Sequence, residues 1–312
     1  MQNHKKKICI VSAFYNECDN LTKFISTFDK TRTLLLKRGY NVSLVLVNDG
    51  STDNSILTVK KILKKKKYIK LISLTKNYGQ QIAIFTGFQK NDADFYGAID
   101  SDGQQDPKYF IQMLKNLEQN KFDIIQMKKK YGNYEGSFKK LFSKFFYFIF
   151  NKLTNIKLES GSSDFYMFTK RVRNEIISSN ISKFFLRGFI HWTGFPKRNL
   201  DYLPTKRLKG VSKYNIYRQL DFALTAIYLY GTKLFIQLFI VSFIIMILSI
   251  LFIMYIIYDY FFLGSLVPGW ATLSILITFS GSLNIFFCCL ITFFSVKLGN
   301  ILSIKPNYIV EK

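Results

Sequence analysis

Two long apolar runs near the C-terminal end constrain this chain more than any other feature of its sequence. They are Leu234–Ile257 and Trp270–Phe294, and the stretch that spans both contains a single charged side chain, Asp259. Each run reaches the roughly 20 residues that a helix needs to cross the hydrocarbon core of a bilayer. A buried helical hairpin in a soluble protein is the alternative, but apolar runs of this length disfavour it. We therefore predict a two-helix transmembrane hairpin over residues 234–296.

The charges beside the runs predict how the hairpin is oriented. The loop between the runs has no Lys or Arg, whereas Lys233 precedes the first run and Lys297 and Lys305 follow the second. By the positive-inside rule, both ends of the hairpin lie in the cytoplasm. The sequence thus predicts a multi-pass protein of the cell (inner) membrane, with a cytoplasmic domain over residues 1–215 and a cytoplasmic tail over residues 297–312.

The chain is also strongly basic. It has 44 Lys and Arg against 20 Asp and Glu, a net charge of +24, and 49% of its residues are hydrophobic. A composition this apolar excludes a disordered chain. A basic cytoplasmic domain suits a partner with negative charge, such as lipid headgroups or a phosphorylated substrate. No signal peptide is expected, because the apolar stretch that follows Lys7 is broken at Asn16.

Two further segments are predicted to lie near the membrane surface. Phe138–Phe150 places apolar side chains at helical spacing with its lysines set apart, which is typical either of a helix in the headgroup zone or of a buried core helix. Residues 216–233, directly before the first apolar run, are predicted to form a juxtamembrane interfacial helix.

The cysteines and histidines offer little material for a metal or redox site. The four cysteines show no metal-binding spacing and are interpreted as packing residues in a reducing compartment. His191, one of two histidines, is interpreted as a packed or interfacial side chain.

The first half of the chain alternates short β-rich runs with helical patterns. This rhythm predicts an α/β fold with a mostly parallel sheet and helices on both faces. The predicted strands are Ile8–Ser12, Ser43–Val47, Ile69–Leu74, Phe95–Ile99 and Asp123–Met127. The predicted helices are Leu21–Lys37, Asn54–Lys66, Gln80–Lys90 and Pro107–Glu118.

Polar clusters follow three of the predicted strands. Tyr15–Glu17 follows the first, Asn48–Asp53 the second and Asp100–Asp102 the fourth. Ligands of such sheets bind at the carboxyl ends of the strands. Two carboxylates two residues apart, at the end of a hydrophobic strand, can hold a hard divalent cation that keeps open positions for phosphate oxygens. Such a cation makes a diphosphate a better leaving group.

These clusters and three later motifs occur in the order seen in one enzyme family. The later motifs are Gly161–Phe165, Phe185–Gly188 and Arg207–Tyr214. The sequence resembles the family 2 glycosyltransferases of the GT-A fold, and within them the polyprenyl-phosphate group that contains bactoprenol glucosyltransferases and dolichol-phosphate mannose synthases. The resemblance covers nearly the whole chain. Asn48 and Gly103 depart from it, since the family usually has Asp and Leu there.

The resemblance implies a role for each matching residue. Tyr15, Glu17, Asp49 and Ser51 would border the nucleotide of a UDP-sugar, together with Asp100. Asp100, Asp102 and Gln104 would hold Mg²⁺ or Mn²⁺ against the diphosphate, and Asp164 would lie near the reacting centre. Asp53 is expected to cap the following helix instead.

The acceptor's own chemistry predicts the mechanism. A phosphomonoester is largely dianionic at neutral pH, so that its oxygen can attack the anomeric carbon without a strong base. We therefore expect an inverting, single displacement in which Asp102 and Asp164 are the catalytic residues and Asp164 orients or stabilises. Basic side chains must meet the acceptor phosphate. The candidates are Arg207, Lys213, Lys128, Lys130 and Arg187.

The prediction is thus a metal-dependent hexosyltransferase that makes a lipid-linked sugar for cell-surface glycans, with glucose as the default sugar. A GDP-mannose or UDP-aminoarabinose transferase of the same group is the alternative. A catalytically silent, basic membrane-anchored binding module is the alternative of another class, and it leaves the strand-end carboxylates unexplained. The partners implied are a UDP-sugar, a polyprenyl phosphate such as undecaprenyl phosphate, the bilayer and further copies of the chain. No nucleic-acid partner is expected, because no motif supports one.

Overall fold

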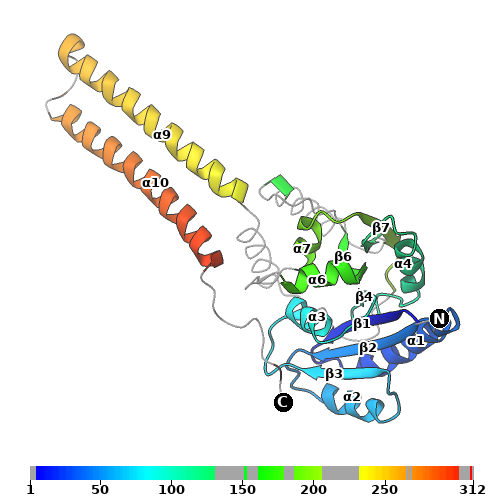
Figure 1. Cartoon of the computed structure of the whole chain (residues 1–312). Helices are drawn as coiled ribbons and strands as arrows, with labels where there is room; N and C mark the ends of the chain where they lie inside the picture. The colour runs from blue at the N-terminus through cyan, green and yellow to red at the C-terminus, as the bar shows by residue number, and fades with distance from the viewer. Residues whose placement is uncertain are drawn as a thin grey trace. The chain divides into compact units, whose positions relative to one another are not determined.

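A computed structural model describes residues 5–130, 151–152, 161–178, 186–205, 232–264, 267, 269–301 and 310 (Figure 1). The chain forms two compact units. The first contains a β-sheet with its helices, and the second contains two long apolar helices. Each unit is described by itself. The predicted interfacial segment 138–150 lies outside the described residues, as does the predicted segment 216–233 except for its last two residues, which begin α9.

The sheet of the first unit has seven strands in the order β3-β2-β1-β4-β6-β5-β7. Strand β6 is antiparallel to its neighbours β4 and β5, and the other pairs are parallel. The strands are β1 (Lys7–Phe14), β2 (Asn41–Asn48), β3 (Ile69–Ser73), β4 (Phe95–Ala98), β5 (Ile124–Lys129), β6 (Ser162–Thr169) and β7 (Lys197–Tyr202). The mostly parallel sheet predicted from the sequence is confirmed, and it has two strands, β6 and β7, that the sequence did not predict.

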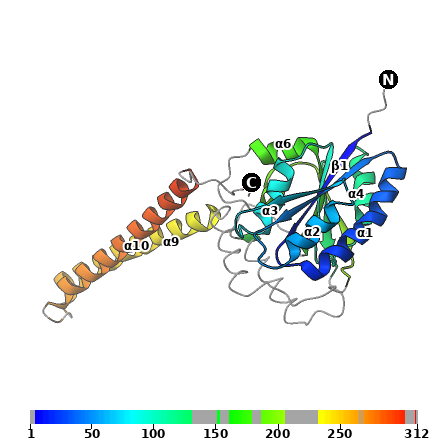
Figure 2. The ribbon, with the colours of Figure 1, turned by 90° about the horizontal axis from the view of Figure 1, so that it is seen from below.

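Helices cover both faces of the sheet. They are α1 (Cys18–Lys37), α2 (Ser55–Leu63), α3 (Gln80–Gln89), α4 (Tyr109–Leu117), α6 (Lys170–Ser178) and α7 (Leu186–Trp192). The view in Figure 2 shows α1 and α4 on one side of the sheet and α3 and α6 on the other. The first four begin and end within about three residues of the predicted helices.

The alternation of side chains along β1 explains this layering. Ile8 and Ile10 are buried with Phe28 of α1, whereas Cys9 and Val11 are buried on the other face with α3 and α6. Successive strand residues point to opposite faces, so a strand with helices on both sides is apolar throughout. That is why the strand runs could be found in the sequence.

The second unit consists of α9 (Thr232–Tyr258), a short π-helical turn η1 (Asp259–Leu263) and α10 (Trp270–Ile301), with the two long helices side by side (Figure 1). Two helical segments, Ile236–Leu263 and Trp270–Ser295, are long and apolar enough to cross a membrane, with mean hydropathies of 3.0 and 2.0. Most of the described side chains in these two segments are exposed within the structure. Within the unit, Phe239 packs against Phe286 across the two helices, with ring centroids 5.4 Å apart.

Candidate active site

The sheet topology brings the polar clusters to one edge. Strands β2, β1 and β4 are adjacent and parallel, so their carboxyl ends lie together. Strand β6 runs the other way and therefore begins at this edge. Its pairing of Tyr166 with Ala98, continued by two residues, sets Asp164 level with Asp100. The predicted positions after β1, β2 and β4 and the first residues of β6 thus meet at one site.

The loop after β1 is fastened to the loop after β2 through Asn16. Its side-chain oxygen accepts the backbone N–H of Thr52 at 2.8 Å and of Asp53 at 3.3 Å, and its own N–H donates to Ser51 Oγ at 3.0 Å. Asn16 has φ of +54°, a left-handed conformation that Asn tolerates better than most residues. Asn16 therefore joins two loops that the sequence analysis treated separately.

The neighbouring site residues also have local partners. Glu17 Oε2 accepts the side-chain amide of Asn20 at 2.6 Å, and Tyr15 beside it is half-buried. Asn48 Oδ1 accepts the N–H of Ser51 at 2.9 Å, so the amide supports the turn. Asp53 Oδ1 accepts the N–H of Ser55, the first residue of α2, at 3.0 Å, although Asn54 and not Asp53 occupies the N-cap position of this helix.

Asp49 holds the loop that leads into α3. It is 3% exposed, and its two oxygens accept the backbone N–H groups of Tyr78 at 2.8 Å and Gly79 at 3.0 Å. The next residue, Gly50, has φ of +70°, and a Cβ on it would lie 2.4 Å from the carbonyl carbon of Lys76. Only glycine allows the two loops to approach this closely.

The first turn of α3 provides two amides that sequence reasoning missed. Gln80 Nε2 donates to Asp100 Oδ1 at 2.5 Å, and Gln81 Nε2 donates to Asp164 Oδ2 at 2.6 Å. The other oxygen of Asp100 accepts from Gln105 Nε2 at 2.6 Å. The partial positive charge of a helix N-terminus also favours carboxylates placed around it.

The predicted metal ligands lie in the loop after β4. Asp102 is half-exposed, and its Oδ1 accepts the N–H of Gln104 at 3.0 Å. Thr205 pins this loop by donating to the carbonyls of Gly103 and Gln104. In the described part of the chain, no group of three or more His, Cys, Asp or Glu residues could hold a metal ion.

The chemistry of the three predicted ligands nevertheless fits a hard divalent cation. Asp100, Asp102 and Gln104 offer only oxygen donors. Carboxylate oxygens have several lone-pair sites, so the amides on Asp100 leave capacity for a cation. Two carboxylates and one amide would leave positions on the cation for water and for the diphosphate oxygens of a substrate.

The predicted phosphate-binding residues are described only in part. Lys128 pairs with Ser162 in the sheet and so lies close to the start of β6, near Asp164. Lys130 forms an exposed ion pair with Asp201 at 3.4 Å. Arg207, Lys213 and the side chain of Arg187 lie outside the described part of the chain.

His191, interpreted from the sequence as a packed or interfacial side chain, is half-buried and lies in polar contacts. Lys197 Nζ lies 2.7 Å from its Nδ1, and its Nε2 lies 3.0 Å from the side-chain oxygen of Gln126. An ammonium group can only donate, so Nδ1 accepts and Nε2 carries the hydrogen. Gln126 in turn donates to the carbonyl of Ser163, next to Asp164. These contacts support the strand that carries Asp164.

Comparison with known proteins places this arrangement in a family. The model of the family described as glycosyl transferase family 2 matches residues 9–181. A bactoprenol glucosyl transferase derived from the SfII prophage of Shigella flexneri is 26% identical over 311 residues, covering 98% of each chain. An uncharacterized glycosyltransferase of Synechocystis sp. is 26% identical over 306 residues, covering 98% of this chain and 95% of that one.

A solved structure was found at lower similarity. Glucosyl-3-phosphoglycerate synthase from Mycobacterium tuberculosis in complex with phosphoglyceric acid has a TM-score of 0.48 and 14% identity. The match covers 71% of this chain and 80% of that one.

Proposed function

This chain belongs to glycosyltransferase family 2, whose model matches more than half of it, and from that premise we propose that it transfers glucose from UDP-glucose to a polyprenyl phosphate at the cytoplasmic face of a membrane. One observation carries the proposal beyond the family. The chain matches a bactoprenol glucosyl transferase from end to end, through the sheet and through both apolar helices. If the acceptor is a lipid, helices that anchor the protein in the bilayer keep it beside its substrate. The alternative of a silent binding module is not retained, because the protein is a glycosyltransferase.

The site residues divide the work between donor and acceptor. Asp49 and Ser51 shape the loop that would receive the nucleotide, and Asp100, Asp102 and Gln104 would hold Mg²⁺ or Mn²⁺. Such a cation, when bound, offsets the negative charge that develops on the departing diphosphate. Lys128, Arg187, Arg207 and Lys213 are candidates to receive the acceptor phosphate.

Asp164 has an electrostatic and orienting role in this proposal. The acceptor phosphate already carries the negative oxygen that attacks, so no side chain need remove a proton from it. Positioning of the two substrates and stabilisation of developing charge then supply the catalysis. A single displacement inverts the anomeric carbon, and an α-linked UDP-sugar would give a β-linked lipid product.

Membrane placement follows from the charges that flank the helices. The loop between α9 and α10 has no Lys or Arg, whereas Lys233 lies at the start of α9 and Lys297 near the end of α10. With both ends on the cytoplasmic side, the sheet has access to cytoplasmic nucleotide sugars while the helices keep the protein at its lipid substrate.

The direct test is transfer by the purified full chain. It is incubated with undecaprenyl phosphate, Mn²⁺ or Mg²⁺ and, one at a time, radiolabelled UDP-glucose, UDP-galactose, UDP-N-acetylglucosamine, UDP-aminoarabinose and GDP-mannose. We expect one donor, UDP-glucose, to give a lipid product that mild acid cleaves, and we expect a chelator to abolish transfer. A product from another donor would correct the sugar, and no product from any donor would refute the proposal.

The metal assignment is tested by Asp102→Asn, with Asp106→Asn in the same loop as the matched control. Asp102→Asn should lower kcat by about 100-fold or more, the usual cost of removing one group that stabilises transition-state charge. Asp106 accepts the N–H of Lys108 at the start of α4, and its variant should keep most of the activity. Full activity of Asp102→Asn would remove Asp102 from the metal site.

A further inference from the structure

We propose that Gln81 is the positioning residue of Asp164, aiming that carboxylate at the reacting centre; this inference rests on the proposed function. Gln81 is the second residue of α3, and its Nε2 donates to Asp164 Oδ2 at 2.6 Å. Asp164 is only 5% exposed, so a donor from the protein replaces much of the water that a carboxylate normally binds.

The other half of the Gln81 amide shows that its orientation is not interchangeable. Gln81 Oε1 is buried and has no hydrogen-bond partner among the residues that the structure describes. Turning the amide over would bring this oxygen against the Asp164 carboxylate, so that two acceptors would face each other. A buried unpaired oxygen is unfavourable, and an apolar side chain would avoid it. The favourable contribution of the Gln81 amide is therefore the hydrogen bond that its Nε2 donates to Asp164.

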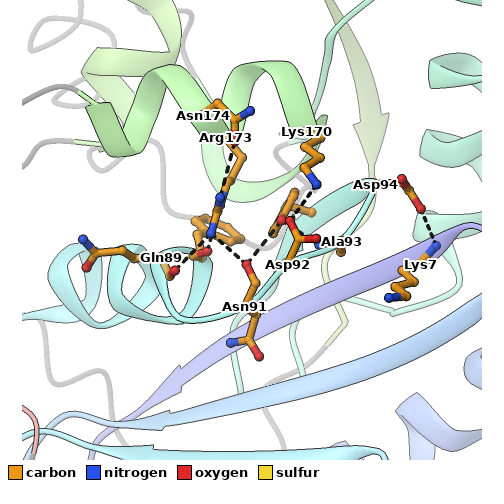
Figure 3. A network of polar contacts seen from close by, with 11 residues as sticks. Lys7, Gln89, Asn91, Asp92, Ala93, Asp94, Lys170, Arg173 and Asn174 are labelled. Carbon is orange, nitrogen blue, oxygen red and sulfur yellow. Dashed lines mark hydrogen bonds and ion pairs between the residues drawn. The ribbon is translucent and has the colours of Figure 1, made fainter.

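The elements that carry these two residues are fastened together a second time, at the far end of α3. Arg173 lies on α6, which follows β6 directly, and it donates to the backbone carbonyls of Phe88 at 3.2 Å, Gln89 at 3.0 Å and Asn91 at 2.9 Å (Figure 3). A cation on the last carbonyls of a helix is favourable. The ten residues of α3 are thus held by β6 at one end and by α6 at the other.

Close packing along α3 fixes its position between these ends. A Cβ on Gly87 would lie 2.4 Å from Val11 Cγ1, so that glycine lets the helix approach β1 closely. With the helix fixed in this way, Gln81 cannot follow Asp164 if that side chain turns. The short contact between them therefore restricts Asp164 to one orientation.

The experiment compares Gln81→Met and Gln81→Glu with Gln112→Met, a control in which an exposed glutamine of α4 is changed. Gln81→Met keeps the length of the side chain but has no donor, and it should lower kcat by about 10- to 100-fold with little change in the KM of the nucleotide sugar. Gln112→Met should behave as the wild type.

Gln81→Glu gives the readout that a merely structural role would not give. Two carboxyl groups this close cannot both ionise easily, so at about pH 6 they share a proton and the carboxylic acid takes over the donor role. As the pH rises towards about 9, both ionise and repel. Activity relative to the wild type should therefore be near normal at the lower pH and fall steeply at the higher one. The other charged groups near this turn in the described part of the chain are Asp49, Asp100 and Lys128. All three are also present in the wild type, so they set the pH at which the fall occurs in Gln81→Glu but do not produce a fall in the wild type.

A second measurement separates this inference from the proposed function. Hydrogen exchange of peptides from β6, followed without substrate, should show a loss of protection at the higher pH in Gln81→Glu and not in the wild type. This result would support the contact between Gln81 and Asp164 even if the wild type transferred no sugar. An active wild type, with both Gln81 variants equal to it in kcat, pH profile and exchange, would overturn the inference.

Discussion

The buried carboxylate of Asp49 allows a quantitative test of how the donor loop is built. Asp49→Asn keeps the shape of the side chain but replaces one acceptor oxygen by an NH₂ group. In the wild type, the two oxygens accept the N–H groups of Tyr78 and Gly79. In the variant, one of these N–H groups keeps a neutral acceptor and the other faces a donor.

The expected cost follows from the two hydrogen bonds. A hydrogen bond to a charged group contributes about 1.5–3 kcal/mol and one between neutral groups about 0.5–1.5 kcal/mol, while a buried donor left unpaired costs about 1–3 kcal/mol. Asp49 is 3% exposed, so water does not replace the lost acceptor. Together these changes destabilise the closed loop by about 2–4 kcal/mol.

Hydrogen exchange of the full chain in detergent measures this locally, without unfolding the membrane helices. If the loop opens independently, a destabilisation of this size makes the amides of Tyr78 and Gly79 exchange about 30- to 1,000-fold faster. Asp106→Asn, which loses a contact in another loop, should leave them unchanged. Unchanged protection of these amides in Asp49→Asn would show that the carboxylate does not hold the loop and would refute the reasoning.

Two further predictions concern the same unit. Gly50→Ala should impair transfer strongly, because the new Cβ would meet the backbone of Lys76 and Asn77. Gly39→Ala is the control: it is also at positive φ but has open space around it, so it should cost only about 1–2 kcal/mol of backbone strain and leave activity intact. Equal kcat/KM for the two variants would contradict this prediction. Burial raises the pKa of the Cys9 thiol to about 12, so this thiol stays protonated at pH 8 and should resist a maleimide in the native protein. The half-exposed Cys18 should react under the same conditions. Peptide mass spectrometry measures the labelling of both cysteines, and rapid labelling of Cys9 in the native protein would count against its burial.

The sheet could be predicted from the sequence where its strands are buried on both faces. Strands β1 and β2 are continuous apolar runs because helices cover both of their sides. Strand β7 was missed because Lys197, Arg198 and Asp201 give it the charged character typical of an edge strand. Strand β6 was missed because it begins with Ser162, Ser163 and Asp164, which have low strand propensity.

The site could be predicted only to the level of its carboxylates. Asp49, Asp100 and Asp102 follow apolar strands, and the topology of parallel sheets brings such positions together. Their partners could not be predicted in this way. The side chain of Asn16 reaches across to another loop and accepts the N–H groups of Thr52 and Asp53. These partners depend on the side-chain rotamer and on the distance between the loops, and neither can be recognised from a periodic pattern of residues.

The pair formed by Gln81 and Asp164 shows most clearly where sequence reasoning ends. Asp164 was assigned only through the family resemblance, because without β6 nothing in the sequence places it beside β4. Once β6 is placed in the sheet, its register determines which face each side chain occupies. Tyr166 and Phe168 pack on the face that α3 covers, and Phe165 and Met167 pack on the opposite face. Asp164 shares the parity of Tyr166 and so faces the first turn of α3. A slip of one residue would turn it to the other face of the sheet. The contact with Gln81 is therefore a consequence of an antiparallel register, and it becomes predictable only when that strand is known.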